Sequence, residues 1–283
     1  MLSSINAWTF PAETSVAEMA RQAERAGFKA LELVVADEGE LTPTTSEPAC
    51  RELARTLGNA RLRTAGLATG LFWPHNYGSP EPASRQKAID LTLSLLDRAA
   101  WIGTDAILVV PAVVGRADDR TPTTSYADAL NRTCDALAQL RFEAEDRGVR
   151  IAIENVWNRF LLSPVETADL IDRLATPWVG VYFDTGNVMP FGYPEDWIAT
   201  LGSRIVRVHI KDYALARPGP DGFCPLGEGD VNWPAVITAL KTHVGYKGPM
   251  TYEGPGDPGE IARRLDTILR HATTDRDPSP RLP

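Results

Sequence analysis

Eight strand-like segments alternate with helical segments along this chain, and this alternation constrains its fold more than any other feature. The expected strands span residues 5–10, 28–35, 62–71, 105–110, 149–154, 178–184, 204–210 and 249–253. The expected helices span residues 14–26, 46–57, 82–102, 125–146, 164–174, 194–201, 233–243 and 259–270. Strict alternation predicts a parallel sheet covered by helices. A count of eight predicts closure into a (β/α)8 TIM barrel, which typically takes ~250 residues.

A doubly wound open sheet is the structural alternative to the barrel. It is disfavoured because no G-x-G-x-x-G sequence follows the first expected strand. No stretch has the composition of a linker between domains, so we expect one barrel domain over residues 1–272. Residues 273–283 are polar and contain three prolines, which predicts a flexible C-terminal tail.

Charge and composition narrow the functional classes. The formal net charge of −8 argues against a nucleic-acid partner, because such proteins usually carry a basic excess. The three cysteines include no C-x-x-C pair, which is typical of reduced thiols in the cytoplasm. The first residues lack the pattern of a signal peptide, and the longest apolar run, at 106–114, is too short to span a bilayer. We therefore expect a cytoplasmic protein with no membrane partner.

Four of the expected strands end in side chains that can bind metals. In the segment 149–154, Val149, Ile151 and Ile153 alternate with a second set that ends in Glu154. Asp184 and His209 end the next two strands on the corresponding face, and Glu253 ends the last strand. Since the carboxyl ends of the strands meet at one mouth of an α/β barrel, we expect these four side chains to converge there.

Two glutamates, one aspartate and one histidine form an oxygen-rich ligand set. Such a set suits Mn²⁺, Mg²⁺ or Co²⁺ in octahedral coordination with positions left open for water or substrate. Structural zinc would favour clustered cysteine and histidine, which this chain lacks. Asn155 and Asp212 are candidates to hydrogen-bond the ligands from behind.

Four segments also resemble a known family. They are ENVWNRFLLSP (154–164), GVYFDTGNV (180–188), VRVHIKD (206–212) and GEGDVNW (227–233). They are similar to the sugar (phosphate) isomerases and epimerases of the xylose isomerase-like TIM barrels. Within that family they are most similar to ketose 3-epimerases of the tagatose, psicose, ribulose and xylulose-5-phosphate types. The resemblance covers most of the chain, from residue 27 to residue 253.

The resemblance implies a metal site and an acid–base pair. Glu154, Asp184, His209 and Glu253 would be the metal ligands, with Mn²⁺ the expected ion and Mg²⁺ or Co²⁺ the alternatives. The two glutamates would also be the catalytic pair, one removing a proton beside the sugar carbonyl and the other returning it to the enediolate. The sequence departs from several ketose 3-epimerases at Asn187, where they have a histidine, and in the loop after Glu253.

Eight further residues are candidates to contact the substrate. Lys211 and Arg217 would contact a sugar oxygen or a phosphate, and Glu32 a hydroxyl group or a basic neighbour. Aromatic faces pack against sugar C–H surfaces, so aromatic residues in the strand-end loops would wall the pocket. The full set is Asn155, Asn187, Lys211, Arg217, Trp8, Glu32, Trp73 and His75.

The resemblance implies a metal-dependent enzyme acting on a sugar or sugar phosphate, with a ketose 3-epimerase as the first expectation. An aldose–ketose isomerase such as hydroxypyruvate isomerase and an inosose dehydratase are alternatives with related chemistry. An apurinic-site endonuclease is disfavoured because its three-metal cluster needs more histidines than the four in this chain. A non-catalytic sugar-binding barrel is the alternative outside the enzymes. A homodimer or homotetramer is compatible with the sequence.

Overall fold

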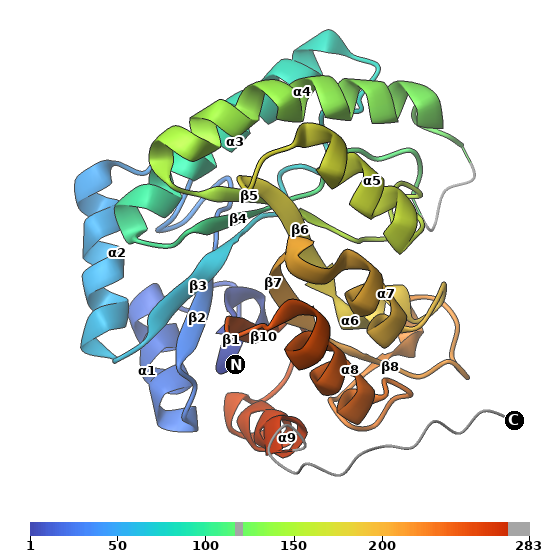
Figure 1. The fold of residues 1–283 in the computed structure, drawn as a ribbon. Helices are drawn as coiled ribbons and strands as arrows, with labels where there is room; N and C mark the ends of the chain where they lie inside the picture. The colour runs from blue at the N-terminus through green and yellow to red at the C-terminus, as the bar shows by residue number, and fades with distance from the viewer. Residues whose placement is uncertain (117–120, 271–283) are drawn as a thin grey trace, which may run out of the picture.

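The chain folds into a closed barrel of eight parallel strands surrounded by helices (Figure 1). The computed structural model describes residues 1–116 and 121–270, so the tail predicted at 273–283 lies outside the described residues. Around the barrel the strands run in the order β1-β10-β7-β6-β5-β4-β3-β2, and β10 pairs with β1 to close it. The predicted (β/α)8 fold is confirmed.

The barrel strands are short and the helices between them are longer. The strands are β1 (Leu2–Asn6), β2 (Ala30–Val34), β3 (Arg63–Ala68), β4 (Ala106–Val109), β5 (Arg150–Glu154), β6 (Val179–Asp184), β7 (Ile205–Ile210) and β10 (Pro249–Tyr252). The outer helices are α1 (Val16–Ala26), α2 (Glu47–Asn59), α3 (Pro82–Ile102), α4 (Tyr126–Arg147), α5 (Pro164–Leu174), α7 (Pro194–Leu201), α8 (Trp233–Ala239) and α9 (Pro258–Arg270). None of the described helices is long and apolar enough to cross a membrane.

Local sequence explains where the helices begin and end. The Ser15 and Ser125 hydroxyls accept hydrogen bonds from the third backbone N–H of α1 and α4, respectively, which satisfies donors that the helix itself leaves free. Gly27 and Gly148 end the same two helices in the left-handed conformation, with φ of 96° and 64°. These boundaries follow the sequence prediction to within a residue or two.

The first strand was predicted at residues 5–10, which is wrong, because β1 occupies Leu2–Asn6. The Asn6 side chain accepts a hydrogen bond from the Trp8 backbone N–H and turns the chain into the 3₁₀ helix η1 (Ala7–Thr9). A short polar side chain that bonds its own backbone competes with strand pairing in this way. The turn carries Trp8 to the mouth of the barrel, where its side chain is half-exposed.

Short elements in the loops add detail that the sequence did not predict. A four-residue helix, α6 (Thr185–Val188), follows β6 directly. The loop after β7 contains a small hairpin of β8 (Asp212–Tyr213) and β9 (Phe223–Cys224), with the 3₁₀ turn η3 (Pro220–Gly222) between them. Another 3₁₀ turn, η2 (Gly202–Arg204), precedes β7. The helix predicted to reach residue 243 changes at Ala239 into the π-helical turn η4 (Leu240–Val244).

The register of the barrel brings the strand ends to one level. Asp184 pairs with His209 across β6 and β7, and His209 pairs with Thr251 across β7 and β10. Glu154 is the last residue of β5 and pairs with Tyr182 of β6. Four neighbouring strands therefore deliver their carboxyl-terminal side chains to the same mouth of the barrel.

Candidate metal centre

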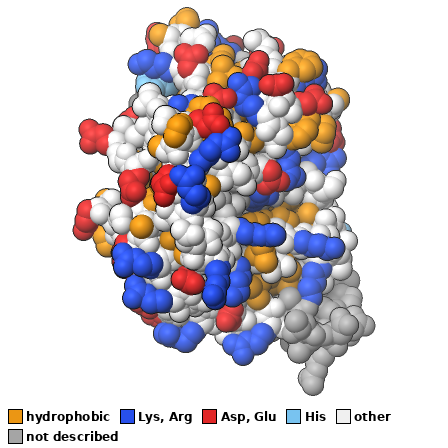
Figure 2. Space-filling model, turned by 90° about the vertical axis from the view of Figure 1, so that its left-hand side faces the viewer, with side chains coloured by type: hydrophobic (Ala, Val, Ile, Leu, Met, Phe, Trp, Pro, Cys, Tyr) orange, Lys and Arg blue, Asp and Glu red, His pale blue; other side chains and the backbone are white. Residues whose placement is uncertain are grey.

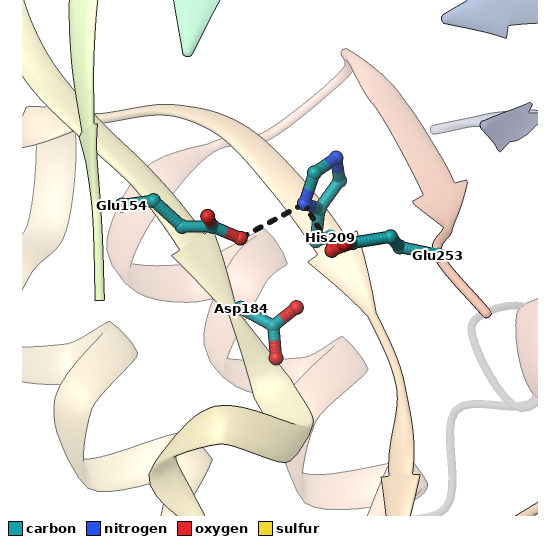
Figure 3. A group of neighbouring side chains, drawn as sticks. All are labelled: Glu154, Asp184, His209 and Glu253. Atoms are coloured by element: carbon teal, nitrogen blue, oxygen red, sulfur yellow. Dashed lines mark hydrogen bonds and ion pairs between the residues drawn. The ribbon is translucent and has the colours of Figure 1, made fainter. Parts of the chain in front are cut away.

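Four side chains point toward one another at the carboxyl-terminal mouth of the barrel (Figure 3). They come from the ends of β5, β6, β7 and β10, and one potential ligand atom of each lies within 4.8 Å of the others. The group consists of Glu154, Asp184, His209 and Glu253. Asp184 and His209 are fully buried, whereas Glu154 and Glu253 retain some exposure to the cavity above them.

Hydrogen bonds hold the Asp184 carboxylate so that one of its oxygens is available to bind an ion. Its Oδ1 accepts from the Asn187 backbone N–H at 2.7 Å and caps α6. The Asn155 side chain donates to the Asp184 carbonyl at 2.9 Å and accepts from the Asp184 N–H at 2.8 Å, so it joins the ends of β5 and β6. The buried Asp184 Oδ2 accepts no hydrogen bond from any described residue, although it forms an ion pair with the Lys211 ammonium group at 3.3 Å.

His209 is held between carboxylates on both sides of its ring. Its Nδ1 faces the centre, 3.1 Å from Glu154 Oε1 and 2.9 Å from Glu253 Oε2. Its Nε2 faces away, 2.6 Å from Glu32 Oε2. A carboxylate on the far ring nitrogen fixes the orientation and tautomer of a metal-binding histidine and raises its basicity. Nδ1 is therefore the nitrogen placed to bind an ion.

Glu32 lies beneath the centre rather than in the substrate pocket. Glu32 was predicted to contact a substrate hydroxyl or a basic neighbour, but its side chain has no exposed surface. Its carboxylate accepts hydrogen bonds from Asn6 and Tyr182 and contacts His209. Sequence reasoning missed Asn6 and Tyr182, although the inward parity of Tyr182 on β6 was available as a signal.

Lys211 supplies a partly buried positive charge beside the four clustered side chains. Its Nζ lies 2.8 Å from Glu253 Oε2 and 3.3 Å from Asp184 Oδ2. The backbone of Lys211 exchanges hydrogen bonds with the Thr185 hydroxyl, which joins the end of β7 to α6. The ammonium group thus compensates part of the negative charge of the three clustered carboxylates.

The two glutamates have opposite electrostatic environments. Burial raises the pKa of Glu154 to about 7, and the nearby charge of Glu253 adds to the rise. Burial also acts on Glu253, but the positive charges of Lys211 and His209 outweigh it and hold its pKa below the usual range. Burial opposes the charged form of His209, yet Glu32 and Glu253 raise its pKa well above the usual value.

The donor set fits a divalent cation. Ligand atoms on opposite sides of an octahedral Mg²⁺ lie roughly 4.2 Å apart, twice a bond of about 2.1 Å, and the cluster spans a comparable distance. The buried Asp184 oxygen without a hydrogen bond is a polar atom that such an ion would satisfy. Three carboxylates and one imidazole would hold the ion. With only these four protein ligands, an octahedral ion would keep positions open for water or substrate.

A cavity of about 390 Å³ opens directly above the centre. Glu154 and Glu253 line it, together with four of the residues predicted to contact the substrate, namely Trp8, Trp73, Asn187 and Lys211. Arg116 and Phe223 also line it, and the sequence analysis had not singled them out. Phe223 stacks on Trp157 with ring centroids 5.2 Å apart, which makes a flat aromatic wall of the kind that accepts sugar C–H surfaces.

Asn155 does not line this cavity, and three other predicted residues also lie outside it. His75 is half-buried, and its Nδ1 lies 3.4 Å from the Ser84 hydroxyl. Arg217 is exposed on the loop between β8 and β9. Asp212, expected behind the metal ligands, instead accepts hydrogen bonds from Gly227, Val231 and Trp233 and anchors the loop that follows β9. These residues lie in loops or near strand ends, and the alternation of side chains along a strand does not predict the path of a loop.

Comparison with known proteins identifies the family. Residues 20–272 match the family model described as xylose isomerase-like TIM barrel. The chain belongs to this family. The chain is 30% identical over 200 residues to 3-oxo-isoapionate decarboxylase of Pectobacterium atrosepticum, an alignment that covers 63% of this chain and 70% of that one.

Other relatives are epimerases. The chain is 29% identical over 149 residues to 2-epi-5-epi-valiolone 7-phosphate 2-epimerase of Actinoplanes sp., and it spans half the length of that protein. Its fold matches D-psicose 3-epimerase of Clostridium cellulolyticum with a TM-score of 0.77 at 19% identity, covering 96% of this chain and 98% of that one. It also matches 3-keto-D-glucoside 4-epimerase of E. coli with a TM-score of 0.78 at 16% identity, covering 95% and 99% of the two chains. At such low identity the structural matches show the fold alone.

Proposed function

We propose that this protein is a divalent-metal-dependent sugar epimerase, with a ketose or ketose phosphate as substrate and inversion at C3 as the reaction. The observation that carries the proposal is the placement of two glutamates, Glu154 and Glu253, on one cavity. They reach it from β5 and β10, on either side of the strands that bear Asp184 and His209. Two carboxyl groups flanking one substrate can remove a proton from one face and return a proton to the other.

The surroundings of the two glutamates support different roles for them. Glu253 lies against Lys211 and His209, which favour its charged form, so it is suited to accept the proton from the carbon beside the carbonyl. Glu154 is more deeply buried and holds a proton more readily, so it is suited to return one. Lys211 lies where it can hydrogen-bond an oxygen of the enediolate. A bound divalent cation would polarise the carbonyl and acidify the adjacent C–H bond.

The aromatic residues of the cavity wall are placed to hold a sugar against Glu154 and Glu253. Trp8, Trp73 and Phe223 line the cavity above the glutamates. Asn187 occupies the place three residues after Asp184, and its side-chain amide donates to the Asn155 carbonyl at 2.9 Å. We propose that the wall of this pocket selects a neutral or phosphorylated sugar of small size. A cavity of about 390 Å³ is consistent with one sugar unit.

A second candidate is decarboxylation of a 3-oxo sugar acid. The 30% identity to 3-oxo-isoapionate decarboxylase favours it, as does a lysine cation beside the ligand set, where a carboxylate could be held. In that reaction the bond between the carboxylate and its carbon breaks, CO₂ leaves, and the electron pair forms an enolate with the ketone. Protonated Glu154 would then return a proton to that carbon. Both reactions share the enolate and differ in the bond that breaks.

A deuterium-exchange assay distinguishes the candidates. Metal-loaded protein is incubated in D₂O with free ketoses, ketose phosphates and 3-oxo sugar acids, and products are read by ¹H NMR. Deuterium at C3 with a new epimer supports the epimerase, and CO₂ release with deuterium at the vacated carbon supports the decarboxylase. Deuterium at C1 or C2 with an aldose product would make the protein an isomerase and overturn both proposals.

Variants of the glutamates test the acid–base assignment. We expect Glu154→Gln or Glu253→Gln to abolish detectable turnover, because each removes a proton-transfer group that typically contributes ~10²–10⁴-fold. Glu52→Gln, on the exposed face of α2, is the matched control and should leave turnover unchanged. Near-normal activity in either cavity variant would remove that glutamate from the mechanism.

A further inference from the structure

The end of the barrel opposite the metal centre carries an open hollow with basic walls. It has a volume of about 970 Å³ and lies where the strands begin. Figure 2, which views the molecule from the left-hand side of Figure 1, shows Lys and Arg side chains on that side with Asp and Glu side chains among them. Five basic residues line the hollow, namely Arg63, Arg147, Arg150, Arg207 and Lys247, and Asp105 is the one acidic residue among its described walls. Such a basic concentration contrasts with the net charge of −8 for the whole chain.

The carboxylates of this region do not balance its positive charges. Arg150 and Arg207 share the single carboxylate of Asp105. Arg207 is buried to 7% exposure, and its remaining donors go to the carbonyls of Ala65 and Val206. Arg147 is paired with carboxylates outside the hollow. Among the described residues, none forms an ion pair with Arg63 or Lys247, so about three positive charges are left without a counter-charge.

An unpartnered buried hydroxyl lies in the same wall. Thr104 is only 6% exposed, and its Oγ1 has no hydrogen-bond partner in the described part of the chain. Buried polar atoms are normally satisfied, so an orphan of this kind points to a group that the protein alone does not supply. Thr104 directly precedes Asp105 in the chain, and both residues line the hollow.

We propose that this hollow binds a small anion bearing phosphate groups. Guanidinium groups bind phosphate oxygens in paired hydrogen bonds, and a hydroxyl donor completes such a site. The uncompensated charge suits more than one phosphate, and a hollow of about 970 Å³ has room for a small bisphosphate. A concave site on the barrel axis suits a small molecule better than an extended polymer. The site is independent of the metal centre and of the reaction proposed there.

Calorimetry with simple phosphates tests the site. The probes are inorganic phosphate and 1,6-hexanediol bisphosphate, titrated into the metal-loaded full chain at matched ionic strength, with chloride and sulfate as reference salts. The test variant is the double substitution Arg63→Gln and Lys247→Gln, at two exposed positions whose replacement leaves the core intact. Its matched control is Lys87→Gln with Arg263→Gln, two exposed basic residues outside the hollow.

We expect the bisphosphate to bind wild type more tightly than inorganic phosphate does. The double variant should lose at least about tenfold in affinity, since it removes two charged hydrogen-bond donors from the hollow. The control pair and Glu154→Gln should bind as wild type does. If all variants bound the probes equally, the binding would be a non-specific effect of the protein's charge, and the proposed phosphate site would be overturned. Loss of binding in Glu154→Gln alone would move the phosphate to the metal centre, and binding of RNA without binding of either probe would also contradict the proposal.

Discussion

Replacing Glu32 with glutamine tests how far the centre depends on a residue that does not touch the ion. Glu32 is fully buried and lies 2.6 Å from His209 Nε2, on the far side of the ring from the four-residue cluster. Glutamine keeps the shape and one acceptor oxygen but removes the charge that makes the imidazole basic. Loss of such a partner typically weakens metal binding 10–100-fold. At about 1.36 kcal/mol for each factor of ten, the expected cost is about 1.4–2.7 kcal/mol.

Calorimetric titration of Mn²⁺ into metal-free protein measures this change directly. Thermal unfolding gives a second reading, because a ligand at 100 times its Kd stabilises the folded state by about 2.7 kcal/mol. At the same Mn²⁺ concentration, a variant that binds tenfold more weakly should gain only about half as much. Glu52→Gln is the control, since it removes an exposed carboxylate far from the barrel interior. If Glu32→Gln bound Mn²⁺ within about twofold of wild type, the argument that Glu32 supports the histidine ligand would be refuted.

Two further predictions concern protons and charge at the same centre. Metal binding should strengthen as pH rises through about 7, because Glu154, with a pKa of about 7, and His209, with a raised pKa, must both lose a proton to bind an ion. The same raised pKa values stabilise the metal-free fold at low pH, and this stabilisation is lost as pH rises. With rising pH, the affinity for the metal should therefore increase while the contribution of these groups to the stability of the metal-free protein decreases. A metal affinity that does not depend on pH would contradict this prediction. Lys211→Met should tighten Mn²⁺ binding by about tenfold or more, because it removes a positive charge beside Asp184 and Glu253, and weaker binding would show that Lys211 positions the ligands instead.

Local sequence patterns were enough to predict the barrel and the convergence of four inward-facing side chains at its mouth. The two-residue period of a strand is a property of the segment itself, so the parity of Asp184 and His209 could be deduced without knowing their neighbours. The family resemblance named the same four residues. The boundary of the first strand was predicted wrongly because the Asn6 side chain bonds its own backbone, a local competition that the apolar pattern of residues 5–10 concealed.

Contacts between distant segments could not be deduced in this way. Glu32 and His209 are 177 positions apart, and their contact requires the closed barrel and its register. Arg207 and His209 share one parity on β7, yet they face opposite ends of the barrel, one in the basic hollow and one in the metal centre. His75, Arg217 and Asp212 were misplaced because loop paths depend on hydrogen bonds such as those that gather the 212–233 loop around Asp212.

Metal stoichiometry tests the central claim of this account most directly. Wild-type protein is loaded with Mn²⁺, separated from free metal and measured by elemental analysis beside the variant Asp184→Asn. This variant changes the buried carboxylate whose Oδ2 has no hydrogen-bond partner among the described residues. We expect one ion per wild-type chain and a large loss of occupancy in the variant, with the fold of both confirmed by circular dichroism. A wild-type protein that retains no divalent ion, or a variant that retains a full equivalent, would contradict the assignment of these four residues as one metal centre.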